Sequence, residues 1–305
     1  MLNTGTAFFS ALGVIALGYI LRRTGLVTRD TGSAIARLVL NVTLPALVLQ
    51  TVPQIEFTET LLFIPLLSLL HTVAAFTITQ LVFRKQPSRT KGLILIASMG
   101  FNNGLFAFPI VLELWGIEAI KLLALFDIGN GIVVLGSNYV IAAHYGSDAP
   151  MRWRTILTSI MRTLATSVPL IALVIALVVN VTNTAYPAVI QRLVETVAGA
   201  NSFLALLVLG IFQSLRVRPG DGALLAKVLG LRYTVGVLTS LVVFFALPGV
   251  RVQQQVLAIA FILPVGMTII PYAVRFKLDT TLATSLVNLS IIISFFMMWI
   301  TVQLL

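Results

Sequence analysis

Long runs of apolar residues follow one another along this chain, and they restrict its fold more than any other feature. Ten runs lie at about residues 5–21, 33–50, 57–83, 92–111, 119–144, 156–179, 192–215, 223–246, 253–274 and 279–303. A helix needs about 20 such residues to cross a bilayer. Only 10% of the 305 residues are charged, too few for the surface of a soluble domain. The sequence therefore predicts an all-α integral membrane protein with ten transmembrane helices.

Positive charge is distributed unevenly among the connections between these runs. The odd-numbered connections hold 14 Lys and Arg residues, whereas the even-numbered ones hold only Arg192 and Arg251. Short cytoplasmic loops are enriched in Lys and Arg. We therefore expect a multi-pass protein of the cell (inner or plasma) membrane with both termini outside the cytoplasm. The net charge of +10 then belongs to a surface that faces membrane lipid, and no nucleic acid partner is expected.

The longest polar interval falls near the middle of the chain, at residues 144–155. It divides the ten predicted helices into a first five-helix repeat, residues 1–145, and a second, residues 146–305. Because five is odd, two such repeats must have opposite orientations in the membrane. Many secondary transporters use this inverted arrangement for alternating access.

The fourth helix of each predicted repeat is interrupted by residues that break helices. These are Asn102, Asn103, Gly104 and Pro109 in the run 92–111, and Pro264, Gly266, Thr268 and Pro271 in the run 253–274. Proline removes a backbone donor, and glycine leaves helical dihedrals at little cost. We expect both helices to be broken and to cross near the middle of the bilayer. Half-helix N-termini that met there would favour an anion, although a single Pro or Gly is more often a packing kink.

Two charged residues lie deep within predicted helices. Asp127 is roughly 13 Å into its helix at 1.5 Å per residue. It could couple transport to protons, or it could accept a hydrogen bond from Asn130 and support the crossing; the sequence leaves both roles open. Arg232 lies comparably deep and cannot realistically lose its proton, so a fixed ion pair or helix-capping role is favoured over substrate contact.

A second pair of polar interruptions lies in the second and seventh runs. Asn41 and Pro45 interrupt the former, and Asn201 and Ser202 lie at a comparable level of the latter. These residues could line a substrate or ion path. Small and polar side chains also allow membrane helices to pack closely, which is at least as good an explanation.

Several motifs together resemble the auxin efflux carrier family, within the superfamily of the bile acid:sodium symporters. They are Asn102-x-Gly104 followed by Pro109, the segment Asn41-Val-Thr-Leu-Pro45, the segment Leu125-Phe-Asp127-Ile-Gly-Asn130, and Gly210 near the end of the seventh run. The resemblance extends over essentially the whole chain. It implies a scaffold domain, a transport domain, and an organic anion bound where the fourth and ninth helices unwind and cross.

The resemblance assigns expected roles to individual residues. By position, Asn102 and Pro109 match the family's fourth-helix pattern, and Pro264 matches its ninth-helix proline. From these matches and from the polar residues of the interruptions we expect substrate contact for Asn102, Asn103, Gly104, Gly266 and Thr268. We expect Pro109, Pro264 and Pro271 to maintain the breaks, with Asp127, Asn130, Arg232, Asn41 and Pro45 in coupling or support. The chain departs from the family pattern at Ala107, where glycine is common, and in lacking an asparagine between Gly266 and Pro271. These departures bear on the substrate more than on the mechanism.

We therefore expect a secondary transporter for a small organic anion, such as a carboxylate. A cation:proton antiporter and a membrane-embedded anion sensor or receptor are the alternatives. No enzymatic activity is expected, because the chain has no Cys, two distant His residues and no Gly-rich phosphate loop. No metal or cofactor is expected, apart from a coupling proton or sodium ion. The oligomeric state is left open, with a homodimer among the options.

Overall fold

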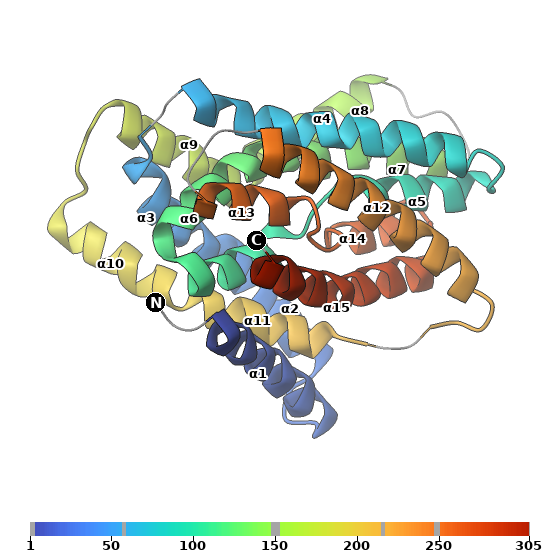
Figure 1. Cartoon of the computed structure of the whole chain (residues 1–305), viewed down its shortest axis with the longest axis horizontal. Coiled ribbons are helices and arrows are strands. Elements are labelled where there is room, and N and C mark those ends of the chain that lie inside the picture. The colour runs from blue at the N-terminus through green and yellow to red at the C-terminus, as the bar shows by residue number, and fades with distance from the viewer. Residues whose placement is uncertain (1–3, 57–58, 148–152, 215–216, 247–250, 305) are drawn as a thin grey trace. The chain divides into compact units, whose positions relative to one another are not determined.

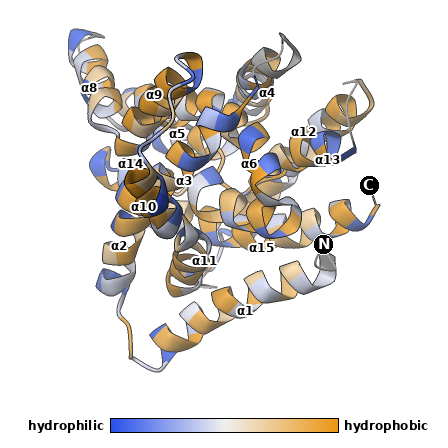
Figure 2. Ribbon diagram, turned by 90° about the vertical axis from the view of Figure 1, so that its left-hand side faces the viewer, coloured by the Kyte–Doolittle hydropathy of each residue, from blue (hydrophilic) through white to orange (hydrophobic). Residues whose placement is uncertain are grey.

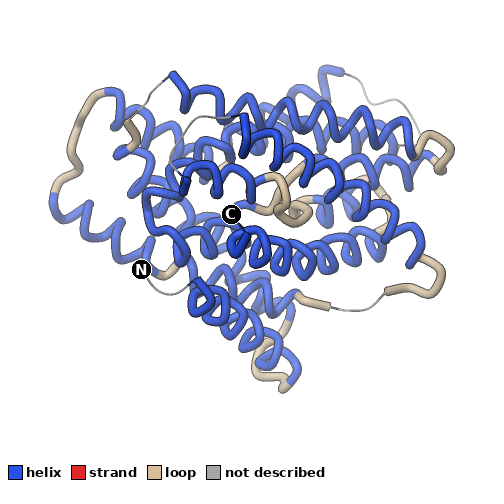
Figure 3. Tube along the Cα trace, in the orientation of Figure 1, coloured by secondary structure: helices blue, strands red, loops and turns tan. Residues whose placement is uncertain are grey.

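The computed structural model describes residues 4–56, 59–147, 153–214, 217–246 and 251–304. Within these ranges the backbone is helix or loop, with a single isolated bridge and no strand (Figure 3). Hydrophobic residues predominate along the long helices such as α15 (Thr280–Leu304) (Figure 2). Seven helical stretches are long and apolar enough to cross a membrane, and the consecutive helices α8 and α9 would make an eighth if taken as one span. The predicted all-α membrane architecture is confirmed.

In its described part, each of the ten predicted apolar runs lies on one helix or on consecutive helices; residues 57, 58 and 215 of these runs are outside the described residues. The fourth run begins on α5 (Ser88–Met99) and continues into α6 (Phe108–Ile132), and the ninth run divides between α13 (Arg251–Ala260) and α14 (Ile269–Arg275). Gly116 interrupts α6 with a φ of 73°, which only glycine adopts without strain, so α6 consists of two helical stretches. The inverted relation of the two repeats, divided at residue 145, stays a prediction.

The chain forms two compact units, and each takes residues from both sides of residue 145. The first comprises Met1–Leu61, Asn103–Ala124 and Leu164–Gln213. Its elements are α1 (Thr4–Arg23), α2 (Arg29–Leu38), the π-helical turn η1 (Val39–Thr43), α3 (Leu44–Thr51), the 3-10 turn η2 (Val52–Gln54), the π-helical turn η3 (Asn103–Ala107), the first part of α6, α9 (Val168–Val181), α10 (Ala188–Gly199) and α11 (Asn201–Phe212).

The second unit comprises Leu62–Asn102, Leu125–Thr163 and Ser214–Leu305. Its elements are α4 (Glu59–Val82), α5, the end of α6, the π-helical turn η4 (Val133–Ser137), α7 (Asn138–Gly146), α8 (Trp153–Thr166), α12 (Gly222–Ala246), α13, α14 and α15 (Thr280–Leu304). Buried residues of α5, including Leu93–Ala97 at 0% exposure, form the centre of its core.

In the first unit, α1 and α11 lie side by side with their backbones in close contact (Figure 1). A Cβ atom on Gly210 of α11 would collide with the carbonyl oxygen of Ile15, and one on Gly18 of α1 would collide with that of Leu207. The Arg22 Nη1 also donates a hydrogen bond to the Ile211 carbonyl at 3.0 Å. Small residues permit such close approach of membrane helices.

Replacing Gly210 by Ala should destabilise the protein by about 1–3 kcal/mol, because the methyl group overpacks the α1–α11 contact. Thermal unfolding of purified protein in detergent measures the effect. Gly13→Ala is the matched control on α1, because nothing lies within 4 Å of a Cβ atom there. Equal melting temperatures for the two variants would contradict the proposed packing.

Candidate crossover site

The two interrupted spans meet in the second unit as a short antiparallel pairing. Helix α5 ends at Gly100, whose backbone is extended, and Phe101 forms a bridge with Val265 in the loop between α13 and α14. The Asn102 N–H donates to the Pro264 carbonyl at 3.0 Å. The expected breaks and their crossing are confirmed.

Proline at position 264 suits this pairing. Its ring removes an N–H that would have no partner in the broken strand, while its carbonyl remains available as an acceptor. A Cβ atom on Gly266 would lie 3.4 Å from the Phe101 carbonyl oxygen, so the two chains approach to van der Waals contact. Pro264 and Gly266 therefore lie at the crossing, as the sequence predicts.

Asn130 satisfies both backbone groups of Phe101. Its Oδ1 accepts from the Phe101 N–H at 2.9 Å, and its Nδ2 lies 3.2 Å from the Phe101 carbonyl. The same Nδ2 donates to Asp127 Oδ1 at 2.8 Å. Asp127 thus orients the amide that holds the break. This contact supports the structural role for Asp127 that the sequence leaves as one of two options.

Serine side chains satisfy the broken backbone of the ninth run. Ser290 Oγ accepts from the Val265 N–H at 3.0 Å, and Ser294 Oγ donates to the Ile262 carbonyl at 2.7 Å. Ser240 Oγ donates to the Ala258 carbonyl at 2.5 Å. In a hydrocarbon environment every freed backbone group needs such a partner. Helices α12 and α15 therefore supply the hydrogen bonds that α13 loses at its end.

Arg232 on α12 joins the two breaks from one side. Its Nη1 donates to the Ala97 carbonyl at 2.8 Å, and its Nη2 lies within hydrogen-bond distance of the carbonyls of Gly100, Leu263 and Pro264, at 3.0, 3.0 and 3.3 Å. The guanidinium also lies 4.8 Å from the centroid of the Phe101 ring. Its side chain is buried, at 4% exposure for the residue. This geometry supports the fixed capping role that the sequence favours.

A positive charge at this place also compensates the dipoles of the half-helices. The C-terminal carbonyls of α5 and α13 carry partial negative charge, and a cation at a helix C-terminus is stabilised by it. Within the described parts of the chain, Arg232 forms no ion pair with a carboxylate. Four carbonyl oxygens take the place of a counter-ion.

An aromatic cluster packs behind the crossing. The His71 ring lies 5.3 Å from Phe101 and 5.1 Å from Phe261, and the Phe126 ring lies 5.6 Å from Phe101. His71 Nδ1 is 3.0 Å from Thr239 Oγ1. The histidine is therefore a satisfied member of the core, in contact with the residue that forms the bridge.

Thr268 differs from the other polar groups at the crossing. Its Oγ1 is buried but has no hydrogen-bond partner, and a Cβ atom on Gly266 would lie 3.5 Å from it. The residue immediately precedes α14 and makes no side-chain cap. Asn102 is 5% exposed and lies on the opposing strand of the bridge. A hydroxyl without a protein partner beside a broken backbone is available to a ligand.

The remaining expected residues lie away from the pairing. Pro271 is in the first turn of α14, beyond the crossing. Pro109 is the second residue of α6 in the first unit, seven residues along the chain from Asn102. Pro271 occupies a first helical turn, where the missing N–H costs no intrahelical bond. Pro109 instead follows the π-helical turn η3 without a gap. Their predicted role in maintaining the breaks is not reflected in a contact at the bridge.

Four other predicted residues belong to the first unit. Asn103 is buried in η3, directly after Asn102 in the chain, and a Cβ atom on Gly104 would lie 3.0 Å from Leu44 Cδ2. Asn41 donates to the Arg37 carbonyl of its own helix at 2.8 Å, and Pro45 is buried in α3. The π-helical turn η1 includes Asn41 and ends just before α3, in which Pro45 is the second residue, and their role in coupling or support stays a prediction.

Sequence reasoning missed the polar groups that satisfy the breaks. Ser290 and Ser294 are four residues apart on α15, and this spacing on an apolar helix was the signal that could have identified them. Thr43 was also missed: its Oγ1 donates to Asn201 Oδ1 at 2.9 Å within the first unit. The hydrogen bond connects the interruption of the second run to that of the seventh.

Comparison with known proteins agrees with this architecture. The family model described as membrane transport protein, which is of the auxin efflux carrier type, matches residues 6–302. The chain belongs to this family. This transporter is also 23% identical over 293 residues to an uncharacterized transporter from Methanothermobacter thermautotrophicus, a match that covers 93% of each chain. The predicted resemblance is confirmed, and the protein is a multi-pass membrane transporter.

Replacing Arg232 by Lys should lower the free energy of unfolding by about 2–4 kcal/mol, because one ammonium group cannot reach four carbonyls on two helices and leaves some of them unsatisfied. Thermal unfolding in detergent checks this. Arg192→Lys, at an exposed position, should change stability by no more than about 0.5 kcal/mol. If both variants lost a comparable free energy of unfolding, or if neither lost any, the capping role of Arg232 would be contradicted.

Proposed function

We propose that this transporter moves a small organic anion, a carboxylate, by alternating access at the crossing of the two broken spans. The observation that carries the proposal is Arg232: a buried guanidinium at the crossing whose described partners are all neutral carbonyls. A charge without an opposite charge in a low-dielectric interior raises the cost of bringing in a cation and lowers that of an anion. The positive charge of Arg232 also argues against a cation:proton antiporter.

Polar groups on the two sides of the bridge support a site there. The Thr268 hydroxyl has no protein partner, and Asn102 places an amide beside the paired backbone. A carboxylate accepts hydrogen bonds from both kinds of donor, and each charge-assisted bond is worth about twice a neutral one. We therefore assign Thr268 and Asn102 to substrate contact, with Gly266 allowing close approach of the substrate to the backbone.

The site would lie in the second compact unit, which contains both halves of the crossing. We infer that this unit corresponds to the transport domain that the family resemblance implies. The distribution of Lys and Arg supports an orientation in a plasma or inner membrane with the odd-numbered connections in the cytoplasm. Asp127 is assigned to support through Asn130, rather than to proton coupling.

The direct experiment is to screen a panel of carboxylates for thermal stabilisation of purified protein and then to measure flux of each stabilising compound in proteoliposomes. A transporter should give both stabilisation and flux. Stabilisation without flux, under imposed pH and sodium gradients, would favour the sensor or receptor alternative.

Replacing Thr268 by Val should weaken binding of the stabilising carboxylate about 10-fold to 150-fold while leaving the melting temperature of the free protein unchanged. The hydroxyl has no hydrogen bond to lose among the described residues, but one bond to a charged ligand is worth about 1.5–3 kcal/mol. Ligand titration followed by thermal unfolding separates the two effects. Thr284→Val, on the exposed side of α15, is the control. Unchanged affinity in Thr268→Val would remove the residue from the site.

Replacing Asp127 by Asn should reduce uptake by no more than about fivefold and leave its pH dependence unaltered. The amide oxygen can still accept from Asn130, so only the charge-assisted part of the bond, about 0.5–1 kcal/mol, is lost. Proteoliposome uptake across a range of pH values tests this. Loss of proton-driven accumulation with intact binding would show instead that Asp127 couples transport to protons.

A further inference from the structure

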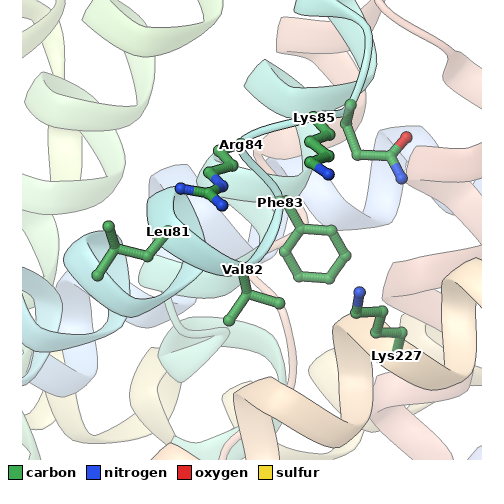
Figure 4. A pocket seen from close by; sticks show the side chains of 7 residues that line it. Leu81, Val82, Phe83, Arg84, Lys85 and Lys227 are labelled. Atoms are coloured by element: carbon green, nitrogen blue, oxygen red, sulfur yellow. The ribbon is translucent and has the colours of Figure 1, made fainter.

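A basic cleft lies in the second unit, away from the crossing. It has a volume of about 560 Å³ and is lined by the end of α4, the turn that follows it, and one residue of α12 (Figure 4). The lining residues are Leu81, Val82, Phe83, Arg84, Lys85, Gln86 and Lys227. Three of the seven are cations, and none is an acid.

The cleft lies at the ends of two membrane-length helices. Helices α4 and α12 contact each other through His71 and Thr239. Val82, at the end of α4, is 11 residues from His71, which is about 17 Å along the helix at 1.5 Å per residue. Lys227, near the start of α12, is 12 residues from Thr239, or about 18 Å. The two distances are nearly equal, and each is close to half the thickness of a hydrocarbon core. Both cleft walls therefore end at one membrane boundary, at the depth of lipid headgroups.

The cations of the cleft are not neutralised by the protein. Lys227 extends from α12 toward Phe83 and its Nζ lies 5.2 Å from the centroid of that ring, while Lys85 points toward the same space from the turn (Figure 4). In the described part of the chain, neither lysine nor Arg84 forms an ion pair. The ammonium groups of Lys85 and Lys227 both lie near the Phe83 ring, and they favour an anion between them because it accepts charge-assisted hydrogen bonds from both.

Arg218, by contrast, is a basic residue of the same unit whose charge is already paired. It lies 2.9 Å from Asp221 and 2.7 Å from Asp279. Although desolvation raises the pKa of Asp279, hydrogen bonds from the Leu282 N–H and from Arg218 outweigh it, and the pKa lies below its ordinary value. Arg218 pairs with Asp279, which accepts a hydrogen bond from the first turn of α15, whereas Lys85 and Lys227 form no ion pair among the described residues.

The apolar part of the cleft continues onto the lipid-facing side of α4. Leu81 and Val82 are 63% and 41% exposed in the last turn of this helix, whereas Phe83 is buried and forms the floor. Exposed aliphatic side chains that line the same cleft as two ammonium groups match a molecule with an anionic head and a hydrocarbon tail. A soluble anion would use the charges but not the aliphatic flank.

We propose that this cleft binds the phosphate-bearing headgroup of an anionic phospholipid, with Lys85 and Lys227 on the phosphate and the acyl chains along Leu81 and Val82. Basic pockets between membrane helices bind such headgroups through the same chemistry. With the orientation proposed above, the lipid belongs to the cytoplasmic leaflet. The site is separate from the crossing, and its occupancy does not depend on the identity of the transported anion.

The test is to titrate delipidated protein in neutral detergent with phosphatidylglycerol or phosphatidylcholine and to measure bound lipid by native mass spectrometry. Wild-type protein should prefer phosphatidylglycerol. The double variant Lys85→Gln/Lys227→Gln should bind it about 25-fold more weakly, the equivalent of two cations at about 1 kcal/mol each. Binding of phosphatidylcholine should not change, and Lys85→Arg/Lys227→Arg should restore the preference.

The matched control removes two exposed cations elsewhere, in Arg29→Gln/Lys277→Gln. It should retain wild-type affinity for phosphatidylglycerol within about twofold, because neither residue lines the cleft. An equal loss in the control would show that only general surface charge is involved and would overturn the site. Displacement of phosphatidylglycerol by inorganic phosphate at similar concentration would overturn the lipid assignment in favour of a free anion. Thr268→Val should leave lipid binding intact, which separates this test from that of the proposed function.

Discussion

The structure around the crossing depends on one constraint: a backbone that leaves the helix inside a hydrocarbon layer must find new partners for its N–H and carbonyl groups. Both broken spans meet this requirement with a single bridge, Phe101 to Val265, and with side chains from neighbouring helices. Asn130 serves one strand of the bridge and Ser290 the other. Arg232 then donates to carbonyls at the end of α5 and to those of Leu263 and Pro264 in the loop after α13. The break is therefore stabilised from outside the spans that contain it.

This arrangement has an electrostatic consequence for the site. The Arg232 guanidinium lies among backbone carbonyls, whereas the Asp127 carboxylate is held by Asn130, which binds the backbone of Phe101. A sodium ion would compete with Arg232 for the same carbonyls, whereas an anion would not. The residue that stabilises the break thus also supports the proposal of an anionic substrate.

Much of this architecture could be predicted from the sequence, because the lengths of apolar runs and the positions of Pro and Gly are local properties. They indicated the helices, the two interruptions, and the place of Pro264 and Gly266 at the crossing. The partners of Arg232 could not be predicted, because four carbonyls on two distant segments carry no sequence signature. Ser290 was missed for a related reason: serine is common in membrane helices, and only tertiary contact distinguishes a backbone partner from a packing residue. The role of Pro109 in the break stays a prediction, because this proline follows the π-helical turn η3 and not the bridge itself.

The single bridge between the two broken spans also restricts how they can move. Since Arg232, Asn130 and Ser290 tie the spans to α12, α6 and α15, sliding one span past the other would rupture several hydrogen bonds at once in a medium that offers no replacements. A displacement that keeps these bonds must translate or rotate all the tethered helices together. These hydrogen bonds therefore favour a crossing that keeps its local geometry during the movement that we propose.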